Sequence, residues 1–560
     1  MKFFKIVLFI ILCAVYCMAG YSFESPIVRR LPKPDVKLTQ GDVRVLVVLV
    51  EFADVRFKNP DPVSQFTDYL NKEGYNEYHN IGSVRDYFIK NSMGKFRPTF
   101  DVYGPVTLSG KQADYGGFGR EPDLGKFLPA LSQSLDTLLS WNEIDFLQYD
   151  NDKDGSVDYV VMLYAGISAN GLTGIPAIYP HAGYLGEKGN KLSGKKMGER
   201  GPYINRYACS NEIDPETYRH EKTTSYLNGI GVLVHEFGHL LGLPDFYSYD
   251  GNKTLGSWSV MDKGAYNCPE NVDYIRNCSP PLYSAFERLS LGWLTPIELK
   301  NGGKIQLNKL DDNVAYGITN PENPDEMYLL EYRSNKDWDI GQKNSGMLIW
   351  HIDYVDSIWT TMVNSKEWHM HVDIVEAKFG ELSCSDNLVQ VTGNGESTPC
   401  DVFPGSANVT EFNKFVFWNG LDMNITLSDI TESPDKEYVT FNVTMDEPFR
   451  TEIESSSSTV VIFRPYSETR PVSASSIAVS KTSPPQASVI SQNGIINITT
   501  SLPGTKMVRM FSLNGQLLFE TTMNNTELQV RWPKHLGKQK AVLSVTQGNV
   551  NLFMGVIQER

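Results

Sequence analysis

The chain has 560 residues, of which 41% are hydrophobic and 21% charged. This ordinary globular composition excludes a fibrous or wholly disordered protein. The length exceeds what one hydrophobic core usually supports, so we expect two or three folding units. The formal net charge of −15 argues against nucleic acid or an anionic membrane as the partner.

The N-terminus has the features of a secretory signal peptide. A start with two lysines precedes the apolar run 6–15, and small residues follow it. We therefore expect residues 1–20 to be a signal peptide and residues 21–39 to be a short pro-segment or extension. The protein is then secreted or attached to the outer surface. No later stretch is long and apolar enough to be a transmembrane segment.

Strands and helices alternate in the first half of the chain. The β-branched run 44–52 is typical of a buried strand, and a second strand is expected at 157–164. Between them, Ser83 stands at a cap position before apolar residues at helical spacing, which predicts a helix over 83–91. Later segments such as 347–353 and 438–443 are strand-like. This order predicts an α/β (α+β) catalytic domain over 40–300 and a β-rich continuation over 301–447.

An acidic loop precedes the second predicted strand. Segment 150–158 offers oxygen ligands at alternating positions with glycine at the sixth place, as a calcium loop does, although Val161 replaces the final Glu of an EF-hand. The alternative is an Asx-rich turn that holds no ion. We expect structural Ca²⁺ bound by Asp150, Asp152, Asp154 and Asp158.

The strongest chemical signal is a His-Glu-x-x-His motif after an apolar stretch. On a helix, His235 and His239 lie on one face and can share a metal ion. Glu236 can then reach a metal-bound water as a general base. Gly242 allows the helix to end and the chain to turn back, so that Asp245 supplies a third ligand and leaves a fourth position for water. A chance match to the two-histidine motif alone occurs on the order of once in a hundred chains of this size.

The segment from His235 to Asp245 resembles the extended zinc signature of the metzincin clan, and Met261 stands where that clan has its methionine turn. More narrowly, the run 242–247 followed by 256–261 resembles the immune-inhibitor-A-type metallopeptidases. Similar segments extend the resemblance over roughly residues 40 to 445. It implies a metzincin-like fold and a secreted zinc metalloendopeptidase that hydrolyses extracellular proteins through a zinc-activated water.

Two residues near this motif have competing interpretations. Met261 is expected to pack beneath the metal without binding it, although methionine in a core needs no metal to explain it. Tyr266 is the nearest downstream tyrosine and a candidate to stabilise the oxyanion of the tetrahedral intermediate. It can equally be a packed aromatic side chain.

The C-terminal part of the chain has a different composition. Residues 448–487 are rich in Ser, Thr and Pro, which indicates a linker. Alternating segments from 488 to 560 predict a small β-sandwich. Its run 508–520 resembles the C-terminal sorting domain of type IX secretion cargo, which implies the type IX secretion machinery as a partner. The alternative is a generic β-sandwich binding module.

The remaining cysteines and histidines carry weaker signals. We expect disulfides between the pairs that lie close in sequence, Cys268 with Cys278 and Cys384 with Cys400, which leaves Cys209 over. His369 and His371 could share a metal on one strand face, although single histidines are usually structural.

A function of another class also fits the sequence. The alternative to an enzyme is an inactive surface adhesin or binding protein that retains the fold. The intact Glu236 speaks against it, because a binding protein needs no base beside a zinc site.

Overall fold

The computed structural model describes residues 38–118, 121–169, 176–221, 226–249, 254–269, 276–359, 363–365, 369–378, 398–450, 487–492, 495–500, 506–512, 517–523, 527–531, 540–547 and 550–558. The chain divides into two compact units. Unit 1 comprises Met1–Phe412 and Thr426–Met445, and unit 2 comprises Asn413–Ile425 and Asp446–Arg560.

A mixed sheet of order β2-β1-β3-β7-β4 forms the centre of unit 1. Its first three pairings are parallel, and β4 is an antiparallel edge strand. Every residue from Val45 to Val50 is buried, which explains the continuous apolar run of β1. The strands predicted over 44–52 and 157–164 are confirmed. The strands are β1 (Gly41–Glu51), β2 (Phe96–Thr107), β3 (Val160–Ile167), β4 (His181–Tyr184) and β7 (Arg206–Ile213).

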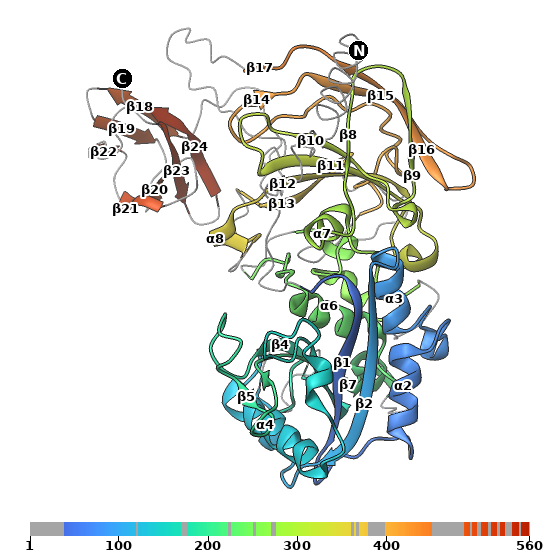
Figure 1. The fold of residues 1–560 in the computed structure, drawn as a ribbon. Coiled ribbons are helices and arrows are strands. Elements are labelled where there is room, and N and C mark those ends of the chain that lie inside the picture. Colours follow the sequence, from blue (N-terminus) through green and yellow to red (C-terminus); the bar gives the residue numbers. More distant parts are fainter. Residues whose placement is uncertain are drawn as a thin grey trace, which may run out of the picture. The chain divides into compact units, whose positions relative to one another are not determined.

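Helices cover both faces of this sheet (Figure 1). Helices α2, α3 and α6 pack on one face, and α4 packs on the other. The predicted helix after Ser83 is confirmed as α3, whose capping box joins Ser83 and Asp86. The helices of unit 1 are α2 (Pro62–Asn71), α3 (Val84–Asn91), α4 (Leu124–Trp141), α5 (Pro215–Glu221), α6 (Ile230–Leu240), α7 (Ala285–Ser290) and α8 (Asp356–Trp359).

A second sheet, of order β13-β12-β11-β10-β8, follows in the chain. One face of it belongs to the same hydrophobic cluster as the first sheet, because Leu348, Trp350 and Ile352 are buried with Val45 and Phe237. The two halves therefore share one core. The strands are β8 (Ile297–Glu298), β10 (Tyr316–Thr319), β11 (Glu326–Arg333), β12 (Gly346–Asp353) and β13 (Val372–Val375), with β9 (Lys304–Asn308), β15 (Ile425–Glu432) and β16 (Tyr438–Met445) in a third sheet and β5 (Lys195–Lys196) and β6 (Tyr203–Ile204) in a small ribbon.

The strands described in unit 2 pair in antiparallel fashion. The alternating segments that the sequence analysis found between residues 488 and 560 contain strands. The strands form sheets of order β14-β17, β18-β19-β22 and β21-β20-β23-β24. They are β14 (Leu421–Asp422), β17 (Phe449–Arg450), β18 (Ala487–Gln492), β19 (Ile495–Thr500), β20 (Lys506–Ser512), β21 (Leu517–Met523), β22 (Glu527–Arg531), β23 (Lys540–Gln547) and β24 (Val550–Gln558).

The cysteines partly test the predicted pairing. Cys268 and Cys278 form the expected disulfide. Cys400 is also disulfide-bonded, and its predicted partner, Cys384, lies outside the described residues. Cys209 is a buried free thiol. The predicted signal peptide and nearly all of the predicted linker also lie outside the described residues.

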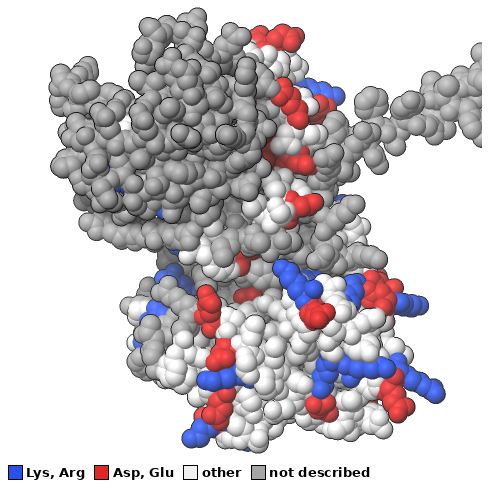
Figure 2. Space-filling view, turned by 90° about the vertical axis from the view of Figure 1, so that its left-hand side faces the viewer, with Lys and Arg blue, Asp and Glu red and all other residues white. Residues whose placement is uncertain are grey.

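Over the lower part of the face shown in Figure 2, acidic and basic side chains lie beside one another. Ion pairs of the described surface include Arg44–Asp101 and Arg56–Glu51. In the part of the chain that the structure describes, none of the helices combines the length and apolar character needed to span a membrane.

Candidate active site

Helix α6 carries the His-Glu-x-x-His residues into the core of unit 1, and ten of its eleven residues are buried. The predicted helix end is confirmed. Gly242 has a φ of +101°, a left-handed conformation that suits glycine. The N–H of Leu243 donates to the carbonyl of Gly238, which closes the last turn. The chain then folds back along the helix and brings Asp245 to the histidines.

Three side chains converge at this point. Oδ1 of Asp245 lies 3.2 Å from Nε2 of His235 and 3.3 Å from Nε2 of His239. The two imidazole rings stand almost perpendicular, with an interplanar angle of 83°. Four-coordinate zinc with bonds of about 2.0–2.1 Å separates neighbouring ligand atoms by about 3.3–3.4 Å. The spacing therefore suits three ligands of one tetrahedral ion.

The hydrogen bonds around these residues also suit a cation. Nδ1 of His235 lies 2.7 Å from the carbonyl of Val260, and Nδ1 of His239 lies 2.8 Å from that of Leu243. A carbonyl only accepts, so each Nδ1 carries a proton, and a ring that binds a metal is neutral and presents its Nε2 lone pair inward. Oδ1 of Asp245 is buried and accepts no well-formed hydrogen bond. Three inward-facing acceptor atoms without a donor fit a bound metal ion.

Glu236 lies beside this group without being part of it. Its side chain is buried, and a backbone hydrogen bond from Ala182 of β4 reaches it. Burial raises the pKa of the Glu236 carboxyl, and the neighbouring His235 and His239 offset part of that rise. A carboxylate that takes up a proton more readily than usual suits a general base.

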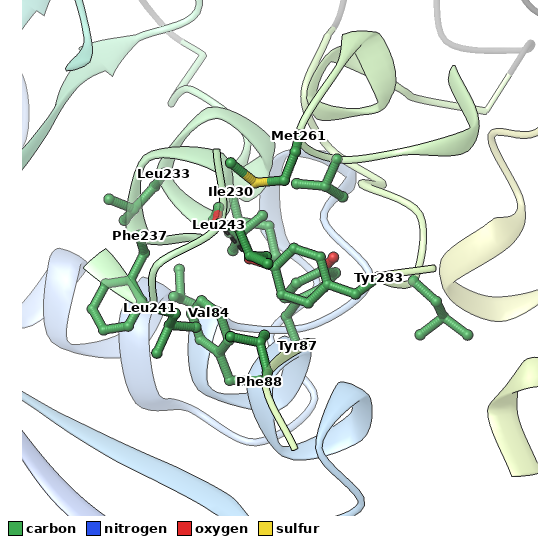
Figure 3. Packing of buried hydrophobic residues seen from close by; sticks show 14 of the residues in the cluster. Val84, Tyr87, Phe88, Ile230, Leu233, Phe237, Leu241, Leu243, Met261 and Tyr283 are labelled. Atoms are coloured by element: carbon green, nitrogen blue, oxygen red, sulfur yellow. Dashed lines mark hydrogen bonds between the residues drawn. The ribbon is translucent and has the colours of Figure 1, made fainter. Parts of the chain in front are cut away.

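Met261 forms the floor beneath the helix. Its side chain is fully buried, and its sulfur stands so close to Gly238 that a Cβ placed there would lie 2.6 Å from it. Figure 3 shows Met261 with Leu243 and Tyr283 against α6, next to the aromatic residues of α3. The carbonyl of Met261 accepts the N–H of Phe246, next to Asp245. The methionine segment thus contacts the helix and the turn that carries the third converging residue.

Residues beyond position 300 hold this methionine segment. The buried guanidinium of Arg333, on β11, donates to the carbonyl of Trp258 at 2.8 Å. The indole N–H of Trp258 donates to Asp401 at 2.8 Å. The hydroxyl of Ser259 donates to Glu287 and accepts the N–H of Met261. No local sequence pattern points to Arg333 or Asp401, because both lie far from the motif in the chain.

The comparisons with known proteins agree with this site. Residues 36–294 match the family described as "Immune inhibitor A peptidase M6, catalytic domain". Residues 36–294 are an immune-inhibitor-A-type peptidase domain. The family is one of metallopeptidases and implies a bound metal. The resemblance read from the sequence motifs is confirmed for this region.

Several curated proteins share this peptidase region. "Immune inhibitor A" of Bacillus thuringiensis is 31% identical over 41% of this chain and 38% of its own length. "Pre-pro-metalloprotease PrtV" of Vibrio cholerae is 24% identical over 40% of this chain and 27% of its own. A "Putative secreted metallopeptidase" of Arthroderma benhamiae is 24% identical over 45% and 42%. The chain thus spans less than half the length of each of these relatives.

Solved structures that align with the chain include PorZ, a surface component of the type IX secretion system of Porphyromonas gingivalis. The alignment covers 46% of this chain and 37% of that one. The identity is 9% and the TM-score is 0.13, which is too low for an inference about fold or function.

A tyrosine that the sequence analysis did not name contacts one of the converging residues. Tyr266, in a short 3-10 turn, is 38% exposed. The phenol that donates to Asp245 belongs to Tyr249, whose hydroxyl lies 2.7 Å from Oδ2. Tyr247 in turn donates to the hydroxyl of Tyr249 at 3.2 Å. Sequence reasoning missed this pair, although both tyrosines follow Asp245 directly.

The acidic loop brings three of its four predicted residues together. Asp150, Asp152 and Asp158 offer oxygens within 4.8 Å of one another. The carboxylate of Asp154 instead forms an ion pair with Lys191. Both oxygens of Asp150 accept backbone N–H groups of the loop itself, from Asp154 and Gly155. The loop thus combines features of a calcium loop and of an Asx-rich turn.

A third group contains Asp353, His369 and His371. Nε2 of His369 lies 2.7 Å from Oδ2 of Asp353, and Nδ1 of His371 lies 2.7 Å from the Asp353 carbonyl. These are hydrogen-bond distances, shorter than the separation of ligands around a shared zinc. The two rings also stack at an angle of 19°, so they do not aim at one point. The group is better explained as a buried hydrogen-bonded cluster at the end of β12.

Proposed function

We propose that the chain is a zinc-dependent metalloendopeptidase with a metzincin-like catalytic domain, in which His235, His239 and Asp245 bind the metal. The observation that carries this proposal is the convergence of two Nε2 atoms on a carboxylate oxygen that lacks a hydrogen-bond donor. Met261 is then the structural residue of a methionine turn beneath the site.

The metal and Glu236 would have different roles in peptide hydrolysis. A zinc ion bound here polarises the substrate carbonyl and makes a water more acidic. Glu236 accepts the proton of the attacking water and returns it to the leaving amine, so that no covalent enzyme intermediate is needed. Its burial excludes bulk water from the carboxylate, which strengthens these proton transfers. Tyr266 remains the candidate to stabilise the oxyanion, and Tyr249 is the phenol that donates to Asp245.

The substrates proposed are extracellular proteins and peptides. Residues 1–20 have the charge and hydropathy of a signal peptide, and one relative is described as a putative secreted metallopeptidase. Residues 488–560 are proposed as a β-sandwich sorting domain for the type IX secretion machinery, on the strength of their strands and of the run 508–520. Cleavage of this region from the extracellular enzyme is the expected outcome, and retention in the mature protein contradicts it.

Calcium is proposed for the acidic loop on the convergence of Asp150, Asp152 and Asp158. Like charges held this close repel unless a cation lies among them, so calcium should stabilise the loop. Adding calcium to the zinc-loaded, chelator-treated protein should raise its melting temperature. Asp152→Asn should reduce that rise, and an unchanged response contradicts the site.

One substitution distinguishes the proposed peptidase from the rival function, an inactive adhesin with the same fold. Glu236→Gln keeps the size of the side chain and removes the base. We expect casein hydrolysis to fall to background while the zinc content stays at that of the parent protein. Glu73→Gln, at an exposed position on the same domain, is the matched control. Casein hydrolysis that survives Glu236→Gln contradicts the mechanism, and a parent protein without hydrolysis favours the adhesin.

A further inference from the structure

We infer that Tyr249 is a positioning residue that orients the carboxylate of Asp245 towards the metal. The inference rests on the proposed zinc site and adds to it the residue that fixes its third ligand. Asp245 presents Oδ1 to both histidines and accepts the phenol of Tyr249 on Oδ2 at 2.7 Å. Oδ1 is therefore the oxygen that can bind the metal, and Oδ2 is the oxygen that accepts the hydrogen bond.

The three converging side chains are each held at the atom that points away from the others. For His235 and His239 the holding groups are the backbone carbonyls of Val260 and Leu243. For Asp245 the holding group is the hydroxyl of Tyr249. Without such a partner a carboxylate rotates about its Cβ–Cγ bond and can exchange its oxygens or bind with both.

The chemistry of a phenol suits this task. Carboxylates only accept hydrogen bonds when ionised, and a tyrosine hydroxyl is protonated at neutral pH, so Tyr249 donates. Its own oxygen accepts the hydroxyl of Tyr247, which fixes the direction of the donated proton. The ring of Tyr247 lies nearly parallel to that of His235, at 18° and 6.4 Å between centroids. The pair of tyrosines thus joins the aspartate to the first histidine.

The test measures zinc affinity, so that it does not depend on turnover. Zinc dissociation constants are determined by competition with a chromophoric chelator, in the Glu236→Gln protein, so that no peptide bond is cleaved during the titration. Tyr249→Phe removes the hydroxyl only, and the side chain is 51% exposed, so the fold should tolerate it. We expect the dissociation constant to rise about 10–100-fold, the effect typical of losing a partner of a metal ligand.

Tyr438→Phe on β16 is the matched control and should change the dissociation constant by less than about twofold, within ordinary experimental scatter for a residue without a role at the metal. Unchanged affinity in Tyr249→Phe overturns the inference. A second contrary result is possible in the protein that keeps Glu236. If Tyr249→Phe lowers casein hydrolysis there even at saturating zinc, while the zinc dissociation constant is unchanged, the phenol acts on the substrate and the inference is wrong. If His235→Ala fails to lower zinc uptake by the parent, the proposed zinc site is itself wrong, and the inference falls with it.

Discussion

Asp245 supplies the only charge among the three converging side chains if both histidines are neutral. Burial raises the pKa of the Asp245 carboxyl, but the histidines, when they are protonated instead, reverse that effect and hold the pKa well below its ordinary value. The carboxylate is therefore ionised over the whole working range of pH. The negative charge attracts a divalent cation more than any neutral oxygen does at the same place.

Asp245→Asn tests the importance of this charge. The amide keeps the shape of the side chain but removes the charge, so we expect the zinc dissociation constant to rise by at least about tenfold. Zinc per protein after dialysis, measured by atomic emission, checks this result. Asp312→Asn, an exposed change elsewhere in unit 1, is the control. Equal zinc content in the two variants would remove Asp245 from the ligand set.

Asp401 gives a second prediction at this scale, concerning pH. Burial, with a contribution from Glu376, raises the pKa of Asp401 to about 6 from 3.8. Because the folded-state pKa is raised, the stabilisation from Asp401 is present below pH 4 and is lost as the pH rises through about 6. Asp401→Asn keeps an oxygen for the N–H groups of Trp258 and Thr398 and does not titrate. The stability of this variant relative to the parent should therefore grow with pH.

The expected size of the change is about 2 kcal/mol in the free energy of unfolding between about pH 4.5 and pH 8. Chemical denaturation of the two proteins at both pH values, in the same metal concentration, measures it. Asp401→Ala loses the hydrogen bonds as well and should be less stable than the parent at both pH values. A parent–Asn difference that does not vary with pH contradicts the prediction.

Single residues were predictable where spacing alone fixes geometry. Two histidines four apart on a helix must share a face, and Gly242 marks where the chain can turn, so the converging residues could be named in advance. The orientation of a side chain in a loop cannot be derived in this way. Tyr249 and Tyr266 are equivalent by sequence, and only the path of the chain after Asp245 separates them.

Among the elements, α6 and the methionine segment interact most closely. Gly238 leaves room for Met261 and for the hydroxyl of Tyr283, and a Cβ there would lie 2.6 Å from the sulfur and 2.9 Å from the hydroxyl oxygen. Helix α6 and the methionine segment are thus in direct contact at Gly238, which lies between His235 and His239 in the chain. A change in either surface should move the other.

A double-mutant cycle tests this contact. Gly238→Ala should destabilise the protein by about 1–3 kcal/mol, because the core cannot accept the added methyl group without moving. Met261→Ala should cost about 2–5 kcal/mol through the cavity it leaves. Since the smaller side chain makes room for the new methyl, the double variant should be more stable than the sum by at least about 0.5 kcal/mol. Strict additivity in chemical denaturation would show that the two surfaces are independent.

Secondary structure was predictable where the pattern is local. The β-branched run 44–52, the capped helix after Ser83 and the strand at 157–164 all depend on residues close in sequence, and all three are present. Sheet order is a different matter. The placement of β1 between β2 and β3, and the antiparallel edge strand β4, depend on contacts between distant segments that no local pattern encodes.

At the scale of the molecule, the peptidase region and the β-rich continuation were expected as successive parts, and the structure shows that they share one core. Composition and length indicate how many cores a chain can form but not which segments enter each one. The family match ends at residue 294, whereas buried residues of the same cluster continue to Val402. Residues of the second sheet therefore form part of the hydrophobic core of the peptidase domain.

This shared core leads to a prediction about truncation. A chain of residues 38–294 loses Leu348, Trp350 and Ile352 from the cluster and loses Arg333 from the methionine segment. The core residues that face them in the first sheet become exposed, and at about 1.5–3 kcal/mol for each large side chain the loss of several such contacts reaches the roughly 5–15 kcal/mol stability of an ordinary domain. We expect it to lack a cooperative thermal transition and casein hydrolysis, whereas a chain of residues 38–447 should show both. A shorter chain that unfolds cooperatively and hydrolyses casein would make the second sheet dispensable, and Arg333 and Asp401 would then have no part in holding the site.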